Sequence, residues 1–323
     1  MIFKNAFHLT IDNFALNYKL LLYKAAVWVI TFALSMAFLY APIVTLLNSR
    51  PMAELVQLLG DFVKALTSGD TAFLSTFADS FQVSMGELVA YLQRNTPSIV
   101  LFALGLLAIL LISRFLDGIG NFTFGCLIDN RLSSYAKTPF MVTCIGNLSK
   151  SALWQIVYVP VTFVYDVCSV FLCYGVFLIL INIISVELIA SAAALMVSAT
   201  LLLAAQALKL TIFNDVVPAI VADKMRLRDA LKRAFSCKAQ RFGSLFSTYL
   251  VTVLLIMCVN VLFAVATFGA GLLITIPMSY LIMTCIQFVS YYDDTHKKYF
   301  LGEDNIVRPK ERTSENFYDD FEL

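Results

Sequence analysis

The residue with the clearest potential for chemistry is Asp166, which lies about midway along a long apolar run. A charged side chain at the centre of a membrane-spanning helix costs about 2.5–3.5 kcal/mol on insertion scales. We therefore expect Asp166 to face the interior of a helix bundle and to be paired or protonated there, with Tyr165 and Asn260 as candidate neighbours. Two roles suit this position: a polar contact that fixes how the helices pack, or a proton or substrate site.

A second polar site is the pair Arg114 and Asp117, near the end of another apolar run. Residues three apart share one face of a helix, so these two side chains can form a salt bridge. At a predicted membrane interface such a pair indicates a structural contact more than catalysis.

Known catalytic signatures are absent from the sequence, which has no Walker A motif and no Gly-x-Ser-x-Gly elbow. Tyr165-Asp166 is similar to one half of an intramembrane aspartyl protease site, but the other half, Gly-x-Gly-Asp in a later span, is missing. Asp117-Gly118 is similar to the start of the CDP-alcohol phosphotransferase motif, but the Ala-Arg pair that should follow is missing. We therefore predict a protein that is not an enzyme and that uses no cofactor.

Basic side chains gather on the stretch 213–242, which lies between two apolar runs. Its apolar residues recur with the spacing of one helix face, so the stretch should form an amphipathic helix in the headgroup layer on the cytoplasmic side. Basic residues near an anionic membrane surface contribute about 1 kcal/mol each. We predict a collar that holds lipid headgroups, made of Arg226, Arg228, Lys232, Arg233, Lys238 and Arg241.

The composition is that of a membrane protein. Hydrophobic residues make up 60% of the chain and charged residues only 14%, whereas about a quarter of a soluble protein is charged. The net charge of +1 argues against a nucleic-acid partner, and the two histidines, near opposite ends, argue against a His-rich metal site. We predict an all-α, polytopic membrane helix bundle, formed as a single domain over 1–292, with spans at 20–47, 98–118, 153–184, 188–212, 244–267 and 272–291.

Two segments differ from the spans. Residues 52–95 carry two apolar stripes separated by Thr67-Ser68-Gly69-Asp70, a helix stop-and-start signal. We predict an external amphipathic helical hairpin there, which is either a cap on the bundle or a lid over an apolar cavity. Residues 293–323 are polar and charged, and we predict a disordered cytoplasmic tail.

Three pairs of residues suggest an internal repeat: Asp129-Asn130, Asn214-Asp215 and Asp293-Asp294 each follow an even-numbered span. Amphipathic stretches at 2–18 and 131–151 precede the first and third spans, as 213–242 precedes the fifth. We therefore predict three repeats of one surface helix and two spans, all pointing the same way. The segments 1–19, 121–151 and 209–241 are basic and 48–96 is acidic, which places both termini of a multi-pass cell-membrane protein in the cytoplasm.

A resemblance covers residues 209–290. Asn214-Asp215, the helix Ala230-Leu231-Lys232-Arg233-Ala234-Phe235 and the span that follows resemble the polytopic membrane regions of poorly characterised bacterial families, one of which is fused to glycerophosphodiester phosphodiesterases. The resemblance implies a bacterial inner-membrane protein and assigns no reaction.

Two functions are compatible with these features. The first is a carrier-like or lipid-handling bundle, which the apolar hairpin, Asp166 and the basic collar favour, with membrane lipids as partners. The alternative is a structural or accessory subunit that binds another membrane protein. It is favoured by the small residues along the fourth span, which allow close helix approach.

Overall fold

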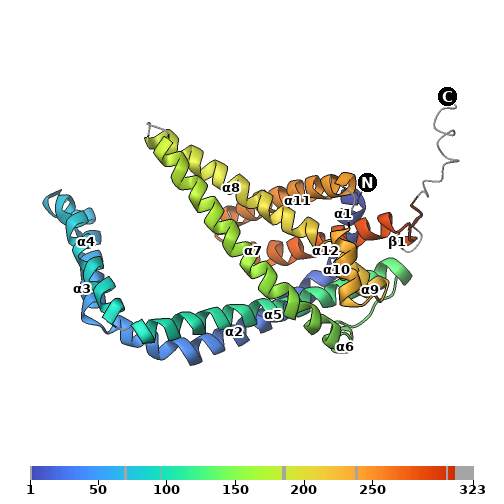
Figure 1. Cartoon of the computed structure of the whole chain (residues 1–323), viewed down its shortest axis with the longest axis horizontal. Coiled ribbons are helices and arrows are strands. Elements are labelled where there is room, and N and C mark those ends of the chain that lie inside the picture. Colours follow the sequence, from blue (N-terminus) through green and yellow to red (C-terminus); the bar gives the residue numbers. More distant parts are fainter. Residues whose placement is uncertain are drawn as a thin grey trace. The chain divides into compact units, whose positions relative to one another are not determined.

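The computed structural model describes residues 2–68, 71–94, 96–183, 187–236, 239–302 and 305–309. Within these ranges the chain is helical except for one two-stranded sheet, so the main part of the all-α prediction is confirmed (Figure 1). Six of these helices are long and apolar enough to cross a membrane, as predicted. They are α2 (Ala15–Leu47), α5 (Thr96–Ser134), α7 (Leu148–Ile183), α8 (Glu187–Ile212), α11 (Ala239–Ala266) and α12 (Leu272–Asp294).

Contacts divide the chain into two compact units, and the single membrane domain over 1–292 stays a prediction. Unit 1 consists of Met1–Ala25 and Phe115–Leu323, and unit 2 runs from Ala26 to Arg114. Both boundaries fall inside long helices, α2 and α5. The sequence could not indicate this division, because both helices are apolar on either side of it.

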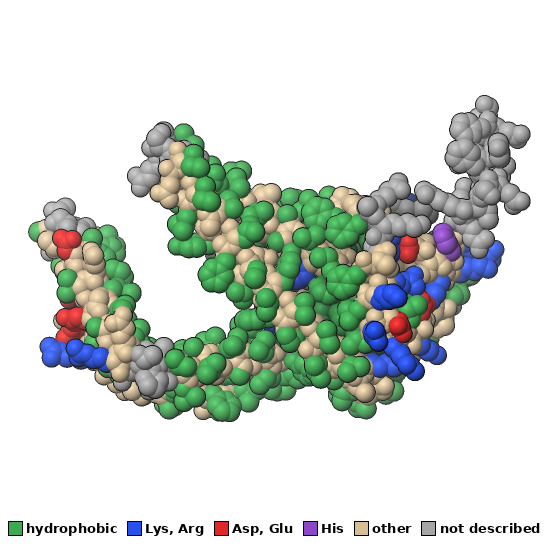
Figure 2. All heavy atoms as spheres, viewed as in Figure 1, with side chains coloured by type: hydrophobic (Ala, Val, Ile, Leu, Met, Phe, Trp, Pro, Cys, Tyr) green, Lys and Arg blue, Asp and Glu red, His purple; other side chains and the backbone are tan. Residues whose placement is uncertain are grey.

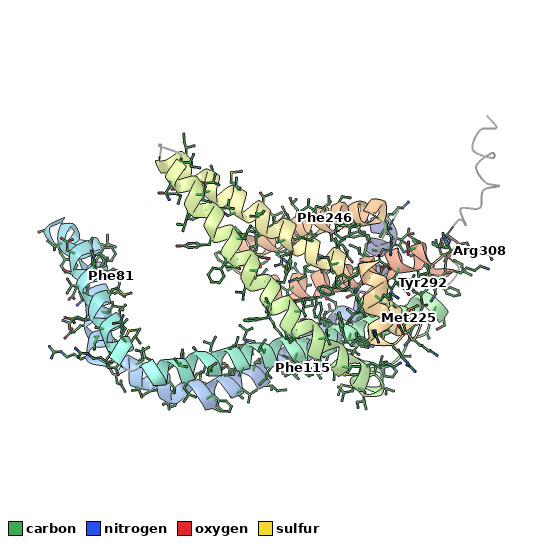
Figure 3. The ribbon with its side chains drawn as sticks, in the orientation of Figure 1. Phe81, Phe115, Met225, Phe246, Tyr292 and Arg308 are labelled. Carbon is green, nitrogen blue, oxygen red and sulfur yellow. The ribbon has the colours of Figure 1, made fainter. Side chains whose placement is uncertain are left out.

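Unit 2 contains two helices in the segment predicted as a hairpin, α3 (Arg50–Ser68) and α4 (Thr71–Arg94), which pack against each other. The rings of Phe62 and Phe77 stack with their centroids 4.2 Å apart. Phe81, labelled in Figure 3, continues the aromatic stripe along α4. Gly69 and Asp70 of the predicted turn lie outside the described residues, and the external position of the pair stays a prediction.

The core of unit 1 is built largely from the second half of α5 and from α12. Phe122, Phe124, Ile128 and Leu132 of α5 are all at most 2% exposed. The helix therefore extends beyond 118, where we predicted the end of the span. The helix continues to Ser134 because these apolar side chains pack inside the protein and need no lipid around them.

Three short helices each precede a long one: α1 (Ile2–Asp12) before α2, α6 (Phe140–Gly146) before α7, and α10 (Leu227–Phe235) before α11. A fourth, α9 (Val216–Ala222), lies between α8 and α10 in the chain and packs on α10. On α10, Ala230 and Ala234 are buried, as expected for the apolar face of an amphipathic helix. This order of elements agrees with three units, while the internal repeat itself stays a prediction.

The tail predicted to be disordered from 293 onward begins with ordered structure, which corrects that prediction for the described part. Strands β1 (Tyr299–Gly302) and β2 (Asn305–Val307) pair antiparallel. Tyr299 is fully buried, and its hydroxyl donates to Asp293 Oδ1 and accepts from Asn5 Nδ2, each at 2.9 Å. The polar composition of this segment gave no indication of its strands, because their order depends on contacts with the other end of the chain. Residues 310–323 lie outside the described ranges.

Candidate functional site

Asp166 forms an ion pair with Lys209 of α8. The distance from Lys209 Nζ to Asp166 Oδ1 is 2.7 Å, and the two side chains are only 15% and 19% exposed. Gln206, also on α8, donates from Nε2 to the same oxygen at 3.3 Å. Asp166 is thus paired, but through residues other than the neighbours that we expected.

Neither expected neighbour is the partner in this ion pair. Tyr165 donates its hydroxyl hydrogen to the carbonyl oxygen of Ala205 at 2.7 Å. Asn260 Oδ1 is buried and has no hydrogen-bond partner among the described residues. These two side chains were chosen from the sequence for their polarity alone, and polarity does not show which helices are adjacent.

A signal for the true partner was present in the sequence. Asp166 lies 17 residues before the end of α7 at Ile183 (183 − 166), and Lys209 lies 22 residues after the start of α8 at Glu187 (209 − 187). At about 1.5 Å per residue, the two residues are about 26 Å and 33 Å from the connection between the helices. The side chain of Lys209 is long enough to bridge the difference between these two distances. The ammonium group of Lys209 and the carboxylate of Asp166 therefore meet at the same height along the two antiparallel helices.

An apolar groove lies beside this ion pair, between α7, α8 and α11, and has a volume of about 450 Å³. It is lined by Tyr165, Cys168, Ser169, Leu172, Cys173, Leu201, Ala204, Ala205, Leu208 and Phe246. Phe246, labelled in Figure 3, is the contribution of α11. Tyr165 and Leu208, which adjoin Asp166 and Lys209 in the chain, line one end of this α7–α8–α11 groove, whereas the two charged residues themselves do not line it.

Asp117 pairs with Lys24 of α2, while the predicted pair with Arg114 stays a prediction. The distance from Lys24 Nζ to Asp117 Oδ1 is 3.2 Å. Lys24 also lies over the ring of Tyr280 on α12, 3.9 Å from its centroid. A cation held by a carboxylate and an aromatic face joins α2, α5 and α12. Spacing within one helix could not reveal this pair, because its partners are 93 residues apart.

The predicted collar divides into exposed and internally paired residues. Arg226, Arg228 and Lys232 are exposed. Arg241 binds Asp215 through two nitrogens, at 2.6 Å and 2.9 Å, and its Nε lies 3.1 Å from Asp294. Arg233 lies 3.4 Å from Asp223. The guanidinium groups of Arg233 and Arg241 bind carboxylates of the same chain, Lys238 lies outside the described residues, and the lipid collar stays a prediction. Figure 2 shows Lys and Arg side chains gathered over α9 and α10, whereas hydrophobic side chains cover α7 and α8.

The Asp and Asn pairs that suggested the repeat meet at one end of unit 1. The third pair ends α12 itself, and the last turns of α12 contact both of the others. The hydroxyl of Tyr292 donates to Asp129 at 2.7 Å, and Asn214 donates to Ser290 at 3.0 Å. Asn214 is 1% exposed and also accepts from the hydroxyl of Tyr249. A satisfied polar network of this kind fixes one arrangement of the helix ends.

Asp223 connects the C-terminal segment to α10 and α12. It accepts hydrogen bonds from Lys297 and from the hydroxyl of Tyr291, and Arg233 lies beside it. Burial alone would raise the pKa of this carboxyl group. The hydrogen bonds from Lys297 and Tyr291, with the charges of Lys297 and Arg233, outweigh burial and hold the pKa of Asp223 below its usual value.

In the part of the chain that the structure describes, no three His, Cys, Asp or Glu side chains gather as a metal ion would require. Comparison with known proteins gives no family. No protein-family model matches the chain, and neither a curated protein nor a solved structure is significantly similar to it. The evidence on function therefore comes from the geometry of these sites.

Proposed function

We propose that the chain is an integral membrane protein that handles lipid in a carrier-like manner, through the α7–α8–α11 groove. The observation that supports this most directly is an apolar groove of about 450 Å³ whose lining residues Tyr165 and Leu208 adjoin the ion-paired Asp166 and Lys209 in the chain. Sites for small molecules have volumes of about 300–1,000 Å³ and combine apolar walls with a few polar groups. A single acyl chain with its polar attachment matches that combination.

The apolar wall accommodates an acyl chain but cannot select one. Inside a membrane, lipid tails are as apolar as the groove, so the hydrophobic effect gives no preference for either surrounding. We infer that selection comes from Lys209 and Asp166, which carry opposite charges, are paired with each other, and adjoin lining residues at one end of the groove. A zwitterionic head group, with its phosphate toward Lys209 and its ammonium toward Asp166, complements both charges.

The exposed part of the collar supports the same proposal. Arg226, Arg228 and Lys232 remain free of the internal ion pairs that hold Arg233 and Arg241. Three basic residues near an anionic membrane surface contribute about 3 kcal/mol. On the predicted orientation, with both termini in the cytoplasm of a cell-membrane protein, they would attract anionic lipid to the inner leaflet.

Part of the small-residue stripe of α8 packs inside this chain, although Ser191 and Ala192 of the stripe are exposed. Ala190 and Ala194 are 2% and 0% exposed, so they are already buried within this chain. The hydroxyl of Ser198 donates to the carbonyl oxygen of Cys173, which ties α8 to α7. Close helix approach along this stripe is thus used inside the molecule.

The test is native mass spectrometry of the full chain, purified in mild detergent, with one variant that fills the groove. Ala204 lines the groove, so Ala204→Phe places a ring where the acyl chain would lie. Ala192 is exposed on the same helix and does not line the groove, so Ala192→Phe is the matched control. We expect the wild type and Ala192→Phe to retain about one lipid per chain, and Ala204→Phe to retain at least about fivefold less, which corresponds to ~1 kcal/mol.

Equal amounts of bound lipid in Ala204→Phe and in the wild type would overturn the groove as the site. A second protein bound in equal amount, with no lipid, would instead support the accessory-subunit function.

A further inference from the structure

The basic face of α10 consists of Arg226, Arg228 and Lys232, which are exposed and form no ion pair with another described residue. Phe235, the last residue of the helix, is 68% exposed. Arg228, Lys232 and Phe235 are spaced as i, i+4 and i+7, so they lie on one side of the helix. Asp229, the acidic residue of α10, does not cancel three basic charges. This face therefore fits a segment that is acidic and aromatic, because opposite charges attract and aromatic rings pack on cations.

The sequence supplies such a segment at residues 315–323, Glu-Asn-Phe-Tyr-Asp-Asp-Phe-Glu-Leu. It contains four acidic and three aromatic residues and neither Lys nor Arg. These residues lie outside the described ranges, so their composition and their point of attachment carry the argument. Composition makes the segment complementary to the basic face of α10 in both charge and ring content.

The point of attachment lies beside the start of α10. Lys297 bonds to Asp223, which stands four residues before Leu227, the first residue of α10 (227 − 223). Strands β1 and β2 then form an antiparallel hairpin in which Val307 pairs with Tyr299. The hairpin thus returns the chain to within two residues of Lys297 (299 − 297), and the chain leaves β2 close to the basic face.

The linker between the hairpin and the acidic segment is long enough to cover this face. Residues 308–314 number seven (314 − 308 + 1) and span up to about 23 Å when extended, whereas the nine residues of α10 measure about 14 Å. A short tether holds the segment at a local concentration on the order of 1 mM. Exposed ion pairs are individually weak, but at that concentration a dissociation constant of about 1 mM already gives about half occupancy.

We propose that residues 315–323 dock on the basic face of α10 and compete there with anionic lipid headgroups. The inference rests on the proposed function only for the competing ligand, because the docking itself requires no lipid. A docked segment neutralises Arg226, Arg228 and Lys232 and so weakens their attraction for the membrane surface. An anionic bilayer, which presents many charges at once, displaces the segment and exposes the face. The segment therefore sets how much anionic lipid the basic face needs before it binds.

Photo-cross-linking of the full chain measures the docking directly. Phe317→benzoylphenylalanine keeps an aromatic side chain within the acidic segment, and mass spectrometry locates the residue to which it links in neutral detergent. We expect links to residues 224–236 at low salt. Arg226→Glu/Arg228→Glu/Lys232→Glu should lower their yield at least about fivefold, because the reversed charges repel the segment. About 1 M salt should lower the yield as well, since it shortens the Debye length to about 3 Å.

The matched control reverses three basic residues elsewhere on unit 1. Lys4, Lys137 and Lys150 are also exposed, and Lys4→Glu/Lys137→Glu/Lys150→Glu should leave the yield within about twofold of the wild type, as sites outside the contact do. Adding Asp319→Lys/Asp320→Lys to the reversed α10 face should restore the links, because the charges are opposite again.

Lipid added to the detergent tests the competition. Phosphatidylglycerol, which is anionic, should lower the yield of links to α10, and the same amount of phosphatidylcholine should not. The docking is overturned if no link falls within residues 224–236, or if reversing the α10 charges lowers the yield no more than the control does. The competition is overturned if phosphatidylglycerol and phosphatidylcholine act alike. None of these results bears on the groove, which the separate comparison of Ala204→Phe with Ala192→Phe decides.

Discussion

Removing the charge of Lys209 should destabilise the protein more than removing the charge of its partner, Asp166. The two side chains are 15% and 19% exposed, so either substitution leaves a largely desolvated charge. Breaking a buried ion pair from one side costs about 3–5 kcal/mol. The lysine stem lets an unpaired ammonium move toward the membrane interface, whereas the short aspartate side chain cannot follow. We therefore expect a loss of about 3 kcal/mol for Lys209→Met and about 1 kcal/mol for Asp166→Asn.

The double variant tests whether these losses arise from the ion pair. With both charges removed, neither side chain is left as an unpaired ion. We expect Asp166→Asn/Lys209→Met to lose about 2 kcal/mol, less than Lys209→Met alone, which corresponds to a coupling energy of about 2 kcal/mol.

The assay is the free energy of unfolding of the purified protein in detergent, followed by circular dichroism. The matched control is Lys64→Met, because the pair of Lys64 with Asp61 on α3 is exposed, at 80% and 42%. An exposed pair contributes at most about 1 kcal/mol, so this variant should differ little from the wild type. Strictly additive losses in the double variant, or a larger loss for Asp166→Asn than for Lys209→Met, would refute the reasoning.

Three further predictions follow from unit 1. Arg241→Gln removes both bonds to Asp215, whose side chain is 4% exposed. The free energy of unfolding should fall by about 3–5 kcal/mol, and Arg241→Lys should restore only part of it, since an ammonium cannot pair through two nitrogens; full restoration would contradict the bidentate geometry. Because the pKa of Asp223 is lowered, its contribution to stability is present above the ordinary aspartate pKa of about 3.9 and is lost as the pH falls below it. The difference in stability between the wild type and Lys297→Met should therefore shrink below about pH 4, and a difference that grows in acid would count against this linkage. Arg228→Cys, with the seven native cysteines changed to serine, should react with an impermeant maleimide only after the membrane is opened, whereas reaction in intact cells would invert the predicted orientation.

The sequence determined the number and approximate positions of the long apolar helices, the two helices of the 52–95 segment and the amphipathic character of α10. These features depend on local composition and on the period of a single helix, which hydropathy and spacing express directly. The sequence did not show that α5 continues beyond the predicted span, because apolar side chains have the same pattern whether lipid or protein surrounds them. Phe122 and Ile128 continue the helix within the core of unit 1.

Only the tertiary structure decided which polar groups meet. Lys209 is 43 residues from Asp166, Lys24 is 93 residues from Asp117, and Tyr299 reaches Asn5 across 294 residues. Such pairs depend on which helices are adjacent and at what depth, and a lone charge in an apolar run indicates only that some partner is needed. The α7–α8–α11 groove likewise depends on which helices are adjacent. It exists because packed helices leave a space between them, and no single segment of the chain contains that information.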